Sequence, residues 1–301
     1  MRILHIDTGP EMKGGQYQVM LLLGALQSSG HECILLAREG GALWAEAARN
    51  AIHVLAADAK QVWRHSKDVA IVHAHDARAH TIAAIASRRR FVVSRRVAFP
   101  IKRSVASHWK YQRAARFLAV SNFVAHQLEA VGLRKEKIDV VYDAVEPVES
   151  VRYWSANTPA VALATRDRQK GRDLIEEAAA RSGIHVLFSD DLTRDLPGAS
   201  MFIYITRSEG LGSAALLAMN LGVPVVASSI GGLCEVFEDG TSGIFVRNEA
   251  ADIAAAMQRV LSDSLATRAR IAAARDRIRT RFTKEQLTAG TMTAYEKALG
   301  G

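Results

Sequence analysis

The sequence predicts an α/β protein made of two doubly wound, Rossmann-like domains. Its 301 residues are about two domains' worth of chain at the common size of ~150 residues each. Short apolar runs alternate with amphipathic segments along most of the chain, which is typical of βαβ units around a parallel sheet. Residues 143–159 break this rhythm with two prolines and several polar residues. We therefore expect a first domain at 1–146, a linker at 147–159 and a second domain at 160–301.

In the first half, the apolar runs predict seven buried strands, at residues 2–7, 32–36, 52–55, 69–74, 91–94, 117–120 and 138–142. Helical spacing of apolar residues fills the gaps between these runs. The clearest helical segments are 16–29, 81–88, 105–116 and 122–131. Gly30 follows the first of them, and glycine commonly ends a helix. Strands and helices in this alternation predict a parallel sheet with helices on its faces.

The same alternation resumes after the linker. It predicts strands at 161–164, 185–188, 201–205 and 223–227, with helices at 172–182 and 213–221. From residue 249 to residue 299 the pattern is almost wholly helical, and we expect the last helix to return towards the first domain. Open parallel sheets bind ligands beyond the carboxyl ends of their strands. Two such domains are expected to face each other across a ligand-binding cleft.

Composition excludes several other classes of protein. Apolar residues make up 49% and charged residues 23% of the chain, as in ordinary globular proteins and unlike disordered ones. The two cysteines, Cys33 and Cys234, form neither a disulfide framework nor a zinc knuckle, which favours a reducing compartment. The apolar run at 2–7 is too short for the core of a signal peptide. The charge-free stretch 210–234 contains glycines, a proline and serines, which predicts a helix–turn–strand unit rather than a membrane helix. We expect a cytoplasmic protein.

Positive charge is concentrated in the first half of the chain. Residues 1–150 hold 21 basic and 14 acidic side chains, whereas residues 151–301 hold 18 and 17. Residues 77–128 contain no acidic side chain. Their eleven basic residues are Arg78, Arg88, Arg89, Arg90, Arg95, Arg96, Lys102, Arg103, Lys110, Arg113 and Arg116. Such a segment attracts nucleic acid, phospholipid headgroups or a phosphorylated acceptor, or it is a solvated face whose counter-charges come from elsewhere in the fold.

The first loop that could hold a ligand follows the first predicted strand. It reads TGPEMKGG over residues 8–15 and leads into a helix. Gly14 and Gly15 let the backbone approach an anion closely, and the helix that follows offers free N–H groups. The loop matches neither the G-x-G-x-x-G dinucleotide pattern nor the P-loop. It predicts anion binding only weakly.

A second loop is more specific. Residues 208–232 read SEGLGSAALLAMNLGVPVVASSIGG, in which Glu209 precedes a helix opened by glycines. This arrangement predicts that the backbone amides of Gly210, Leu211, Gly212 and Ser213 face a phosphate group. The apolar run after the helix predicts the next strand.

This stretch and its continuation, GGLCEVFEDGTSGIFV, resemble the signature of the GT-B fold retaining glycosyltransferases of family 4, the "glycosyl transferases group 1" proteins. Segments of the first half are similar to that family and occur in the same order: SSGHEC, VHAHDARAH, SRRVAFPIKRS, AVSNFVAHQL and KIDVVYDAVE. The resemblance covers nearly the whole chain. It implies the GT-B architecture for the two predicted domains.

The resemblance also implies roles for individual residues. The loop with Gly14 and Gly15 is similar to the one that closes over the donor diphosphate, and Glu209 matches the Glu that contacts the donor sugar. A basic pair in the second domain normally neutralises the diphosphate. Lys170 stands at the Lys position of this pair. The Arg position holds Thr165, so that Arg166 or Arg168 is expected to substitute.

Three features depart from the family pattern. Leu217 occupies the position of a second Glu that binds the nucleotide ribose. Arg95 and Arg96 stand where the family has an active-site His after the strand at 91–94. The stretch between Lys170 and Glu209 is also shorter than usual and lacks one βα unit.

We predict Glu209, His75 and Arg96 as catalytic residues, because all three fall where the cleft is expected. A metal site at His73, His75 and His80 beside Asp76 is conceivable by residue type. No cysteine or carboxylate cluster supports it, and the metal-binding pattern D-x-D does not occur in the sequence. We therefore predict neither a metal nor a cofactor.

The reading that fits best is a retaining glycosyltransferase of hexosyltransferase type. It would move a sugar from a nucleotide-diphosphate sugar to a glycan or glycolipid acceptor, in the synthesis of bacterial envelope polysaccharide or lipopolysaccharide. The family implies catalysis by stabilising the leaving group. Residues 77–128 would dock the protein on the inner face of an anionic membrane, and no nucleic acid is expected as a partner. The alternative is a catalytically impaired GT-B protein that binds sugar nucleotides or partners, because Leu217 replaces a ribose-binding Glu.

Overall fold

The computed structural model describes residues 1–101 and 104–300. The chain divides into two compact units, which we describe separately. Unit 1 comprises residues 1–144 and 284–301, and unit 2 comprises residues 145–283. Residues 147–159, where we expected a linker, are counted with unit 2, and the C-terminal helix is counted with unit 1. Lys102 and Arg103, two of the basic residues singled out above, lie outside the described residues.

Unit 1 is built on a parallel sheet of seven strands. From edge to edge the order is β3-β2-β1-β4-β5-β6-β7. The strands are β1 (Arg2–Asp7), β2 (Glu32–Ala37), β3 (His53–Ala56), β4 (Ile71–Ala74), β5 (Phe91–Arg95), β6 (Arg116–Ala119) and β7 (Ile138–Val140). Five of the six residues of β1 are buried, as expected for a central strand covered on both faces. All seven strands predicted for this half of the chain are confirmed within a few residues.

Helices cover both faces of this sheet. They are α1 (Gly14–Ser28), α2 (Ala42–Arg49), α3 (Ala59–His65), α4 (Ala77–Ala86), α5 (Val105–Arg113), α6 (Asn122–Glu129) and α13 (Lys284–Gly300), with short 3₁₀ turns at Ser66–Asp68 and Lys135–Lys137. Side chains cap several N-termini: Asp76 accepts from two amides of α4, and Ser121 accepts from Val124 of α6. Helix α1 begins at Gly14, two residues earlier than predicted, so Gly14 and Gly15 belong to its first turn rather than to a free loop.

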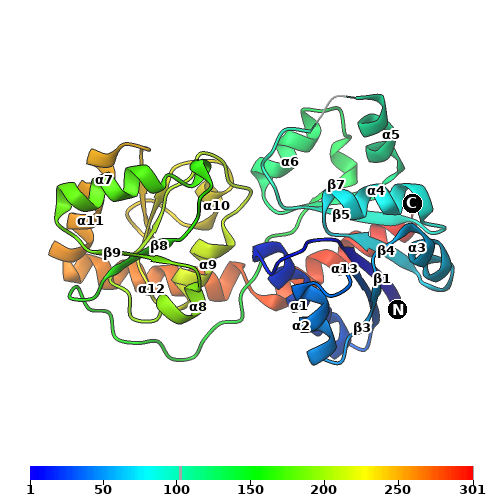
Figure 1. Ribbon diagram of the computed structural model, residues 1–301, viewed down its shortest axis with the longest axis horizontal. Helices are drawn as coiled ribbons and strands as arrows, with labels where there is room; N and C mark the ends of the chain where they lie inside the picture. The colour runs from blue at the N-terminus through cyan, green and yellow to red at the C-terminus, as the bar shows by residue number, and fades with distance from the viewer. Residues whose placement is uncertain (102–103, 301) are drawn as a thin grey trace. The chain divides into compact units, whose positions relative to one another are not determined.

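The C-terminal helix α13 closes the core of unit 1. It packs beside α1 (Figure 1), and Leu287 and Tyr295 of α13 are buried together with Leu22 and Leu26 of α1. Arg90 and Lys297 add polar contacts: Arg90 donates to the carbonyl of Ala298, and Lys297 pairs with Asp139. The last helix is thus part of the first compact unit rather than of the second.

Unit 2 contains a parallel sheet of five strands in the order β12-β11-β10-β8-β9. The strands are β8 (Ala160–Leu163), β9 (Val186–Ser189), β10 (Phe202–Tyr204), β11 (Val225–Ser228) and β12 (Ile244–Val246). The helices are α7 (Arg172–Ser182), α8 (Leu192–Asp195), α9 (Ser213–Asn220), α10 (Leu233–Val236), α11 (Ala250–Ser262) and α12 (Ser264–Arg281), and a 3₁₀ turn spans Arg168–Lys170. Strand β12 was not expected, because its residues stand at the end of the glycine-rich motif 231–246, which the sequence analysis did not assign to a strand.

Each sheet reverses its winding direction at one place. In unit 1 the chain winds from β1 to β2 and β3 on one side and from β4 to β7 on the other, so the reversal lies between β1 and β4. In unit 2 it lies between β8 and β10. In doubly wound proteins the loops after such a pair of strands separate, and ligands bind there at the carboxyl edge of the sheet. The predicted α/β class is confirmed, and these two places are where a site is sought.

Candidate functional site

The reversal point of unit 2 carries the residues predicted to hold the donor. The loop after β8 ends in Lys170, and the loop after β10 contains Glu209. Lys170 Nζ donates to Glu209 Oε2 at 2.7 Å, and both side chains are largely buried, with 24% and 16% of their surfaces exposed. The two residues are 39 positions apart in the sequence, and the adjacent pairing of β8 and β10 brings them together.

Tyr204 completes this contact and was not predicted. Its hydroxyl donates to the same Glu209 oxygen at 2.5 Å and lies 3.4 Å from Lys170 Nζ. Burial and the Glu209 carboxylate raise the pKa of Tyr204 well above its usual value, so the hydroxyl keeps its proton and stays a donor. The amide of Gly210 donates to the other carboxylate oxygen at 3.1 Å. Glu209 is therefore fixed from both sides, while Lys170, which donates to Glu209 and Tyr204, has a third N–H for a ligand.

A glycine-rich cradle follows Glu209. Gly212 has a φ of +109° and precedes α9, whose first residue is Ser213. Gly232 packs against this turn from the loop after β11, and its amide donates to the Glu209 carbonyl at 3.1 Å. A Cβ on Gly232 would lie 1.8 Å from the Gly210 carbonyl oxygen. Only glycine allows the two backbones to come this close, and α9 begins directly after this turn.

Substitution of Gly232 with alanine is expected to destabilise unit 2. The added methyl group would push the 210–213 turn away from α10, at a cost of about 3 kcal/mol, and would weaken nucleotide binding. Denaturant unfolding of the variant tests this expectation. Gly24→Ala is the matched control: nothing lies within 4 Å of its Cβ position in the middle of α1, so stability should rise by roughly 0.5–1 kcal/mol. Equal stability of Gly232→Ala and the wild-type protein would mean that the two turns are not held together as described.

The other residues predicted for the donor site lie less deeply. Arg166 and Arg168 are exposed on the loop after β8. Leu211 is buried and serves the packing of the turn. Leu217, at the position of the family's second Glu, is half-buried on α9 between the buried Leu216 and Ala218. The structure thus brings Lys170 and Glu209 together, whereas it leaves the two arginines in solvent.

The reversal point of unit 1 holds a second polar cluster. Asp7 ends β1, and its carboxylate accepts from the Gly9 amide at 2.8 Å and from Gln16 at 3.0 Å. Asp76 follows β4 and accepts from the amide and the hydroxyl of Thr8. Burial and the charge of Asp76 raise the pKa of Asp7. These contacts tie the loop before Gly14 and Gly15 to the ends of β1 and β4.

His75 and Arg96, both predicted as catalytic, meet at this edge. Arg96 Nη1 lies 3.4 Å from His75 Nδ1, and Arg96 Nε donates to Asp143 Oδ1 at 3.0 Å. Asp143 lies outside residues 77–128, the stretch without acidic side chains. It is therefore one of the counter-charges from elsewhere in the fold that the sequence analysis considered for that stretch. Arg95, by contrast, ends β5 and donates to the carbonyl of Phe99. Of the two adjacent arginines, Arg96 is the one beside His75.

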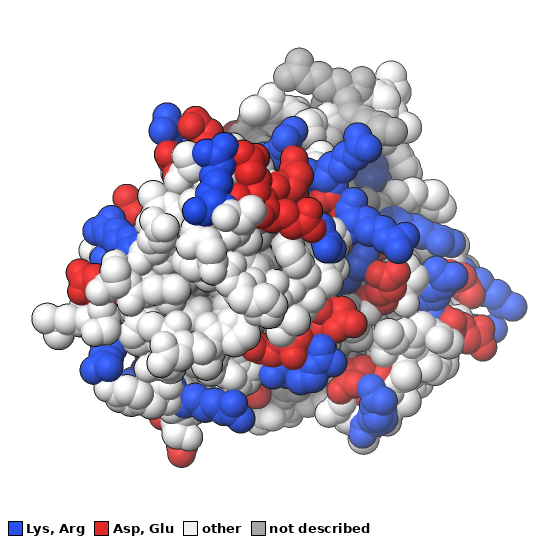
Figure 2. All heavy atoms as spheres, turned by 60° about the vertical axis from the view of Figure 1, so that its left-hand side comes forward, with Lys and Arg blue, Asp and Glu red and all other residues white. Residues whose placement is uncertain are grey.

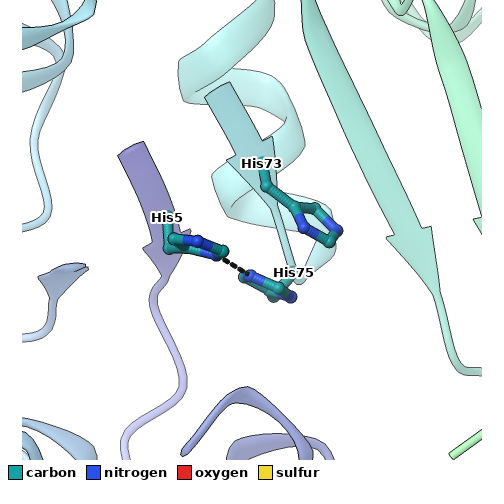
Figure 3. Close-up of side chains that lie close together, drawn as sticks. All are labelled: His5, His73 and His75. Atoms are coloured by element: carbon teal, nitrogen blue, oxygen red, sulfur yellow. Dashed lines mark hydrogen bonds between the residues drawn. The ribbon is translucent and has the colours of Figure 1, made fainter. Parts of the chain in front are cut away.

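Three imidazoles gather beneath this edge. Figure 3 shows His5 on β1 and His75 after β4 pointing toward each other, with His73 beside them. His5 Nδ1 and His75 Nε2 are 3.0 Å apart, and the rings of His73 and His75 are 3.9 Å apart. Burial lowers the pKa of His5 to about 3 and those of His73 and His75 well below the usual value, so all three are neutral at pH 7.

The three histidines that lie together, His5, His73 and His75, differ from the set His73, His75 and His80 that the sequence suggested. His80 is separate: its Nε2 faces the carbonyl of Lys110, and its ring packs against Tyr111. One nitrogen from each of His5, His73 and His75 lies within 4.8 Å of the others, as a metal site requires. However, the rings of His5 and His75 are nearly coplanar in orientation, at 10°, and their centroids are 5.3 Å apart, so His5 Nδ1 and His75 Nε2 point at each other along the line that joins the rings. A metal ion bound between two such nitrogens would hold them about 4 Å apart. The observed distance of 3.0 Å is that of a hydrogen bond.

The functional residues that were not predicted share one property. All four are buried polar residues: Tyr204, His5 and Asp7 lie within strands, and Asp143 follows the end of β7 by three positions. A polar side chain inside an apolar run, such as the His in RILHID or the Tyr in FIYI, is the signal that could have found three of them. Asp143 stands in the segment where the rhythm of strands ends, and no such signal marks it.

Two family models match this chain. The model described as Glycosyltransferase Family 4 matches residues 12–149, and the model described as Glycosyl transferases group 1 matches residues 127–263. Together the two matches cover residues 12–263, which include the reversal point of unit 2 and, in unit 1, β4 with His75 and Arg96; strand β1 precedes them. The first ends at the start of unit 2, and the second includes Lys170, Glu209 and Gly232.

Curated relatives match over parts of their length. The chain is 24% identical to the 2-deoxystreptamine glucosyltransferase of Streptomyces kanamyceticus over 257 residues, which are 68% of this chain and 66% of that enzyme. It is 36% identical to the glycogen synthase of Mycobacterium tuberculosis (strain H37Rv) over 94 residues, or 31% of this chain and 23% of the other. The chain thus spans less than two thirds of these relatives.

Solved structures match over nearly the whole chain. The structure of Anabaena HepE in complex with UDP and glucose superimposes with a TM-score of 0.84 at 17% identity, covering 98% of this chain and 99% of that one. The apo form of the lipopolysaccharide outer core galactosyltransferase WaaB gives a TM-score of 0.74 at 18% identity, with coverage of 98% and 99%. At these identities the likeness is one of fold, and it confirms the predicted GT-B architecture.

Proposed function

Because this chain belongs to the group 1 glycosyltransferases of the GT-B fold, we propose that it transfers a sugar from a nucleotide-diphosphate sugar to a hydroxyl group. The contact of Lys170, Glu209 and Tyr204 at the reversal point of unit 2 carries the proposal. It places a cation and a fixed carboxylate beside the glycine turn that leads into α9. A diphosphate needs the cation and the helix N-terminus, and sugar hydroxyls need the carboxylate.

In this proposal the reaction depends on stabilising the leaving group. Lys170 and the amides of the 210–213 turn hold the diphosphate as its bond to the sugar breaks, with Arg166 or Arg168 as a second cation. The acceptor oxygen bonds to the same sugar carbon from the same face, and its proton passes to the departing phosphate oxygen. Configuration is thereby retained. Charged and polar groups that are already in place stabilise the transition state and so accelerate the reaction. The proposal includes neither a metal nor a cofactor.

His75 and Arg96 of unit 1 are proposed to contact the reacting sugars. Arg96 is held by Asp143, and His75 is held by His5, so both side chains are fixed before a substrate binds. Preorganisation of this kind favours the transition state, because no reorganisation is needed during the reaction. The acceptor is proposed to be a glycan or glycolipid of the bacterial envelope. The WaaB structure, a lipopolysaccharide galactosyltransferase by its description, supports that class.

Release of nucleotide diphosphate from UDP-glucose and related donors tests the proposal. Wild-type protein should release UDP, and Glu209→Gln should bind the donor but release UDP at least tenfold more slowly, because an amide lacks the charge that holds the sugar. Binding without any release of UDP would favour the alternative, an impaired member of the family in which Leu217 reflects lost activity. Failure of every nucleotide sugar to bind would contradict the proposal and leave only the form of the alternative that binds a protein partner.

The basic segment is proposed to dock the protein on the cytoplasmic face of an anionic membrane. Helix α5 exposes 89% of Val105 and 46% of Trp109, with Arg113 stacked on the Trp109 ring and Phe99 exposed nearby. Apolar side chains beside cations are typical of an interfacial helix.

Among the described basic residues of the segment, Arg96 and Arg116 pair with Asp143 and Asp139. In the face shown in Figure 2, basic and acidic side chains are interspersed, so that face shows no segregated positive region. Across residues 1–101 and 104–300, no helix is both long and apolar enough to cross a bilayer.

Co-sedimentation with vesicles of phosphatidylglycerol tests this docking. Binding should fall as salt rises and should fall several-fold in the double variant Trp109→Ala with Arg113→Glu, since each cation near an anionic surface contributes about 1 kcal/mol. Arg194→Glu, an exposed arginine of unit 2, is the control and should bind as the wild type does. Equal binding to neutral phosphatidylcholine vesicles would contradict the docking.

A further inference from the structure

The contacts of His75 fix which of its two nitrogens carries the proton. Arg96 Nη1 lies 3.4 Å from Nδ1, and a guanidinium group can only donate. Nδ1 must therefore present a lone pair. His75 is neutral at pH 7, because burial and the neighbouring His73, His5 and Arg96 lower its pKa well below the usual value. Its single proton is consequently on Nε2.

This assignment extends to His5. The Nε2–H of His75 faces His5 Nδ1 at 3.0 Å, so His5 Nδ1 is the acceptor and the proton of neutral His5 is on its own Nε2. Among the described residues, His5 Nε2 is buried without a hydrogen-bond partner. Buried polar atoms in proteins are nearly always paired, so an unpaired N–H calls for an explanation other than stability. Here the explanation is that His5 must accept at Nδ1 to hold the Nε2–H of His75, and this leaves the proton of His5 on Nε2.

His73 does not take part in this chain of protons. Its ring lies 3.9 Å from that of His75, tilted by 34°. Its Nδ1 is 2.7 Å from the Tyr295 hydroxyl and its Nε2 is 2.8 Å from the Ser94 hydroxyl. Both nitrogens are therefore occupied by other partners. His5 alone, of the three imidazoles, can hold the Nε2–H of His75.

The pair of Arg96 and His75 is complementary to a hydroxyl group. At 3.4 Å their contact is longer than the usual 2.9–3.0 Å, and Asp143 holds Arg96 from its other side at 3.0 Å. A hydroxyl oxygen can accept from Arg96 Nη1 while its proton is donated to His75 Nδ1. A phosphate oxygen cannot donate at neutral pH, and an ammonium group cannot accept. The pair therefore selects a hydroxyl over these charged groups.

We propose that Arg96 Nη1 and His75 Nδ1 together bind one hydroxyl group of a sugar, and that His5 is the positioning residue that keeps His75 in the tautomer this requires. The identity of that sugar as the acceptor rests on the proposed function. The tautomer itself does not, since it follows from the contacts within unit 1.

Nitrogen-15 NMR of histidine-labelled full-length protein tests the proposal at pH 7. His75 should show an unprotonated Nδ1 and a protonated Nε2. Addition of D-glucose or glycerol, as hydroxyl probes, should shift the Nδ1 resonance of His75 and leave that of the exposed His126 unchanged. A protonated Nδ1 in the wild-type protein, or no response to either probe, would overturn the proposal.

Two variants at His5 separate positioning from a structural role. His5→Asn offers an amide oxygen to His75 Nε2–H and should keep both the tautomer and the response to D-glucose. His5→Leu, of similar size, offers no acceptor and should lose the response while unit 1 remains folded. If His5→Leu responds as the wild type does, or if both variants lose the response, His5 does not position His75. Binding of UDP to each variant is measured in parallel: an absence of UDP binding contradicts the proposed function but leaves the result on His75 unaffected.

Discussion

Acidification from pH 7 to pH 5 is expected to lower the free energy of unfolding by about 4–8 kcal/mol. Four histidines of unit 1, His5, His73, His75 and His80, are buried, and burial lowers the pKa of each, to about 3 for His5 and His80. In the unfolded chain they titrate near pH 6.5. Above that pH both states are neutral and stability is unaffected. Below it the unfolded state takes up protons that the native state cannot, which costs about 2 kcal/mol per histidine at pH 5.

The size of this effect is a large share of the 5–15 kcal/mol that stabilises a typical domain. Asp7 acts in the opposite direction, because its pKa is raised in the native state, but it is one group against four. Urea unfolding at pH 7, 6 and 5, followed by circular dichroism, measures the slope. The variant His80→Leu should reduce the slope by up to about 1.4 kcal/mol per pH unit. A stability that does not change between pH 7 and pH 5 would show that these histidines are hydrated or protonated in the native state.

Substitution of Lys170 with alanine is expected to weaken binding of UDP at least tenfold. A charge-assisted hydrogen bond contributes roughly 1.5–3 kcal/mol, which corresponds to about a tenfold change or more in affinity. Loss of the ammonium group also leaves the Glu209 carboxylate without its cation, so that its charge repels the diphosphate. Tyr204 and the Gly210 amide still hold Glu209, and we expect the fold to be kept.

Isothermal titration with UDP measures this change. Arg172→Ala is the matched control, because Arg172 is a cation two residues away that faces solvent and pairs with Glu176 on the surface of α7. The control should bind UDP as tightly as the wild type does. An unchanged affinity of Lys170→Ala, with the wild-type melting temperature, would remove Lys170 from the donor site.

Local patterns in the sequence were enough to predict most of the fold. In strands such as β1 and helices such as α7, the spacing of apolar residues is visible within a few residues, and these elements begin and end close to where that spacing begins and ends. Strand β12 was missed although the equally short β7 and β10 were found, because its residues end a glycine-rich motif and were not assigned to a strand. The last helix was expected to return towards the first domain, and α13 is counted with unit 1. The contact of Tyr295 with His73, more than two hundred residues earlier, could not be predicted, because local pattern contains no information on it.

The candidate site could be predicted only in part for the same reason. Glu209 and Lys170 were found through the family resemblance, and the pairing of β8 with β10 explains why they meet. Tyr204 and His5 were not found, because each is a single polar residue in an apolar run, and only its partners reveal a role. For the basic segment, the sequence left open whether counter-charges come from elsewhere in the fold. A count of charges along the chain could not show that Asp139 and Asp143 pair with Arg116 and Arg96.

Thermal unfolding in the presence of UDP-glucose tests the central claim, that unit 2 binds a nucleotide-diphosphate sugar at Lys170 and Glu209, most directly. A ligand at a concentration of about 100 times its dissociation constant stabilises the folded protein by about 2.7 kcal/mol, which raises the melting temperature by several degrees. We expect this rise with UDP-glucose or with another sugar of UDP, ADP, GDP or dTDP, and a much smaller rise for Lys170→Ala. The same melting temperature with every one of these nucleotide sugars and without them would contradict the claim.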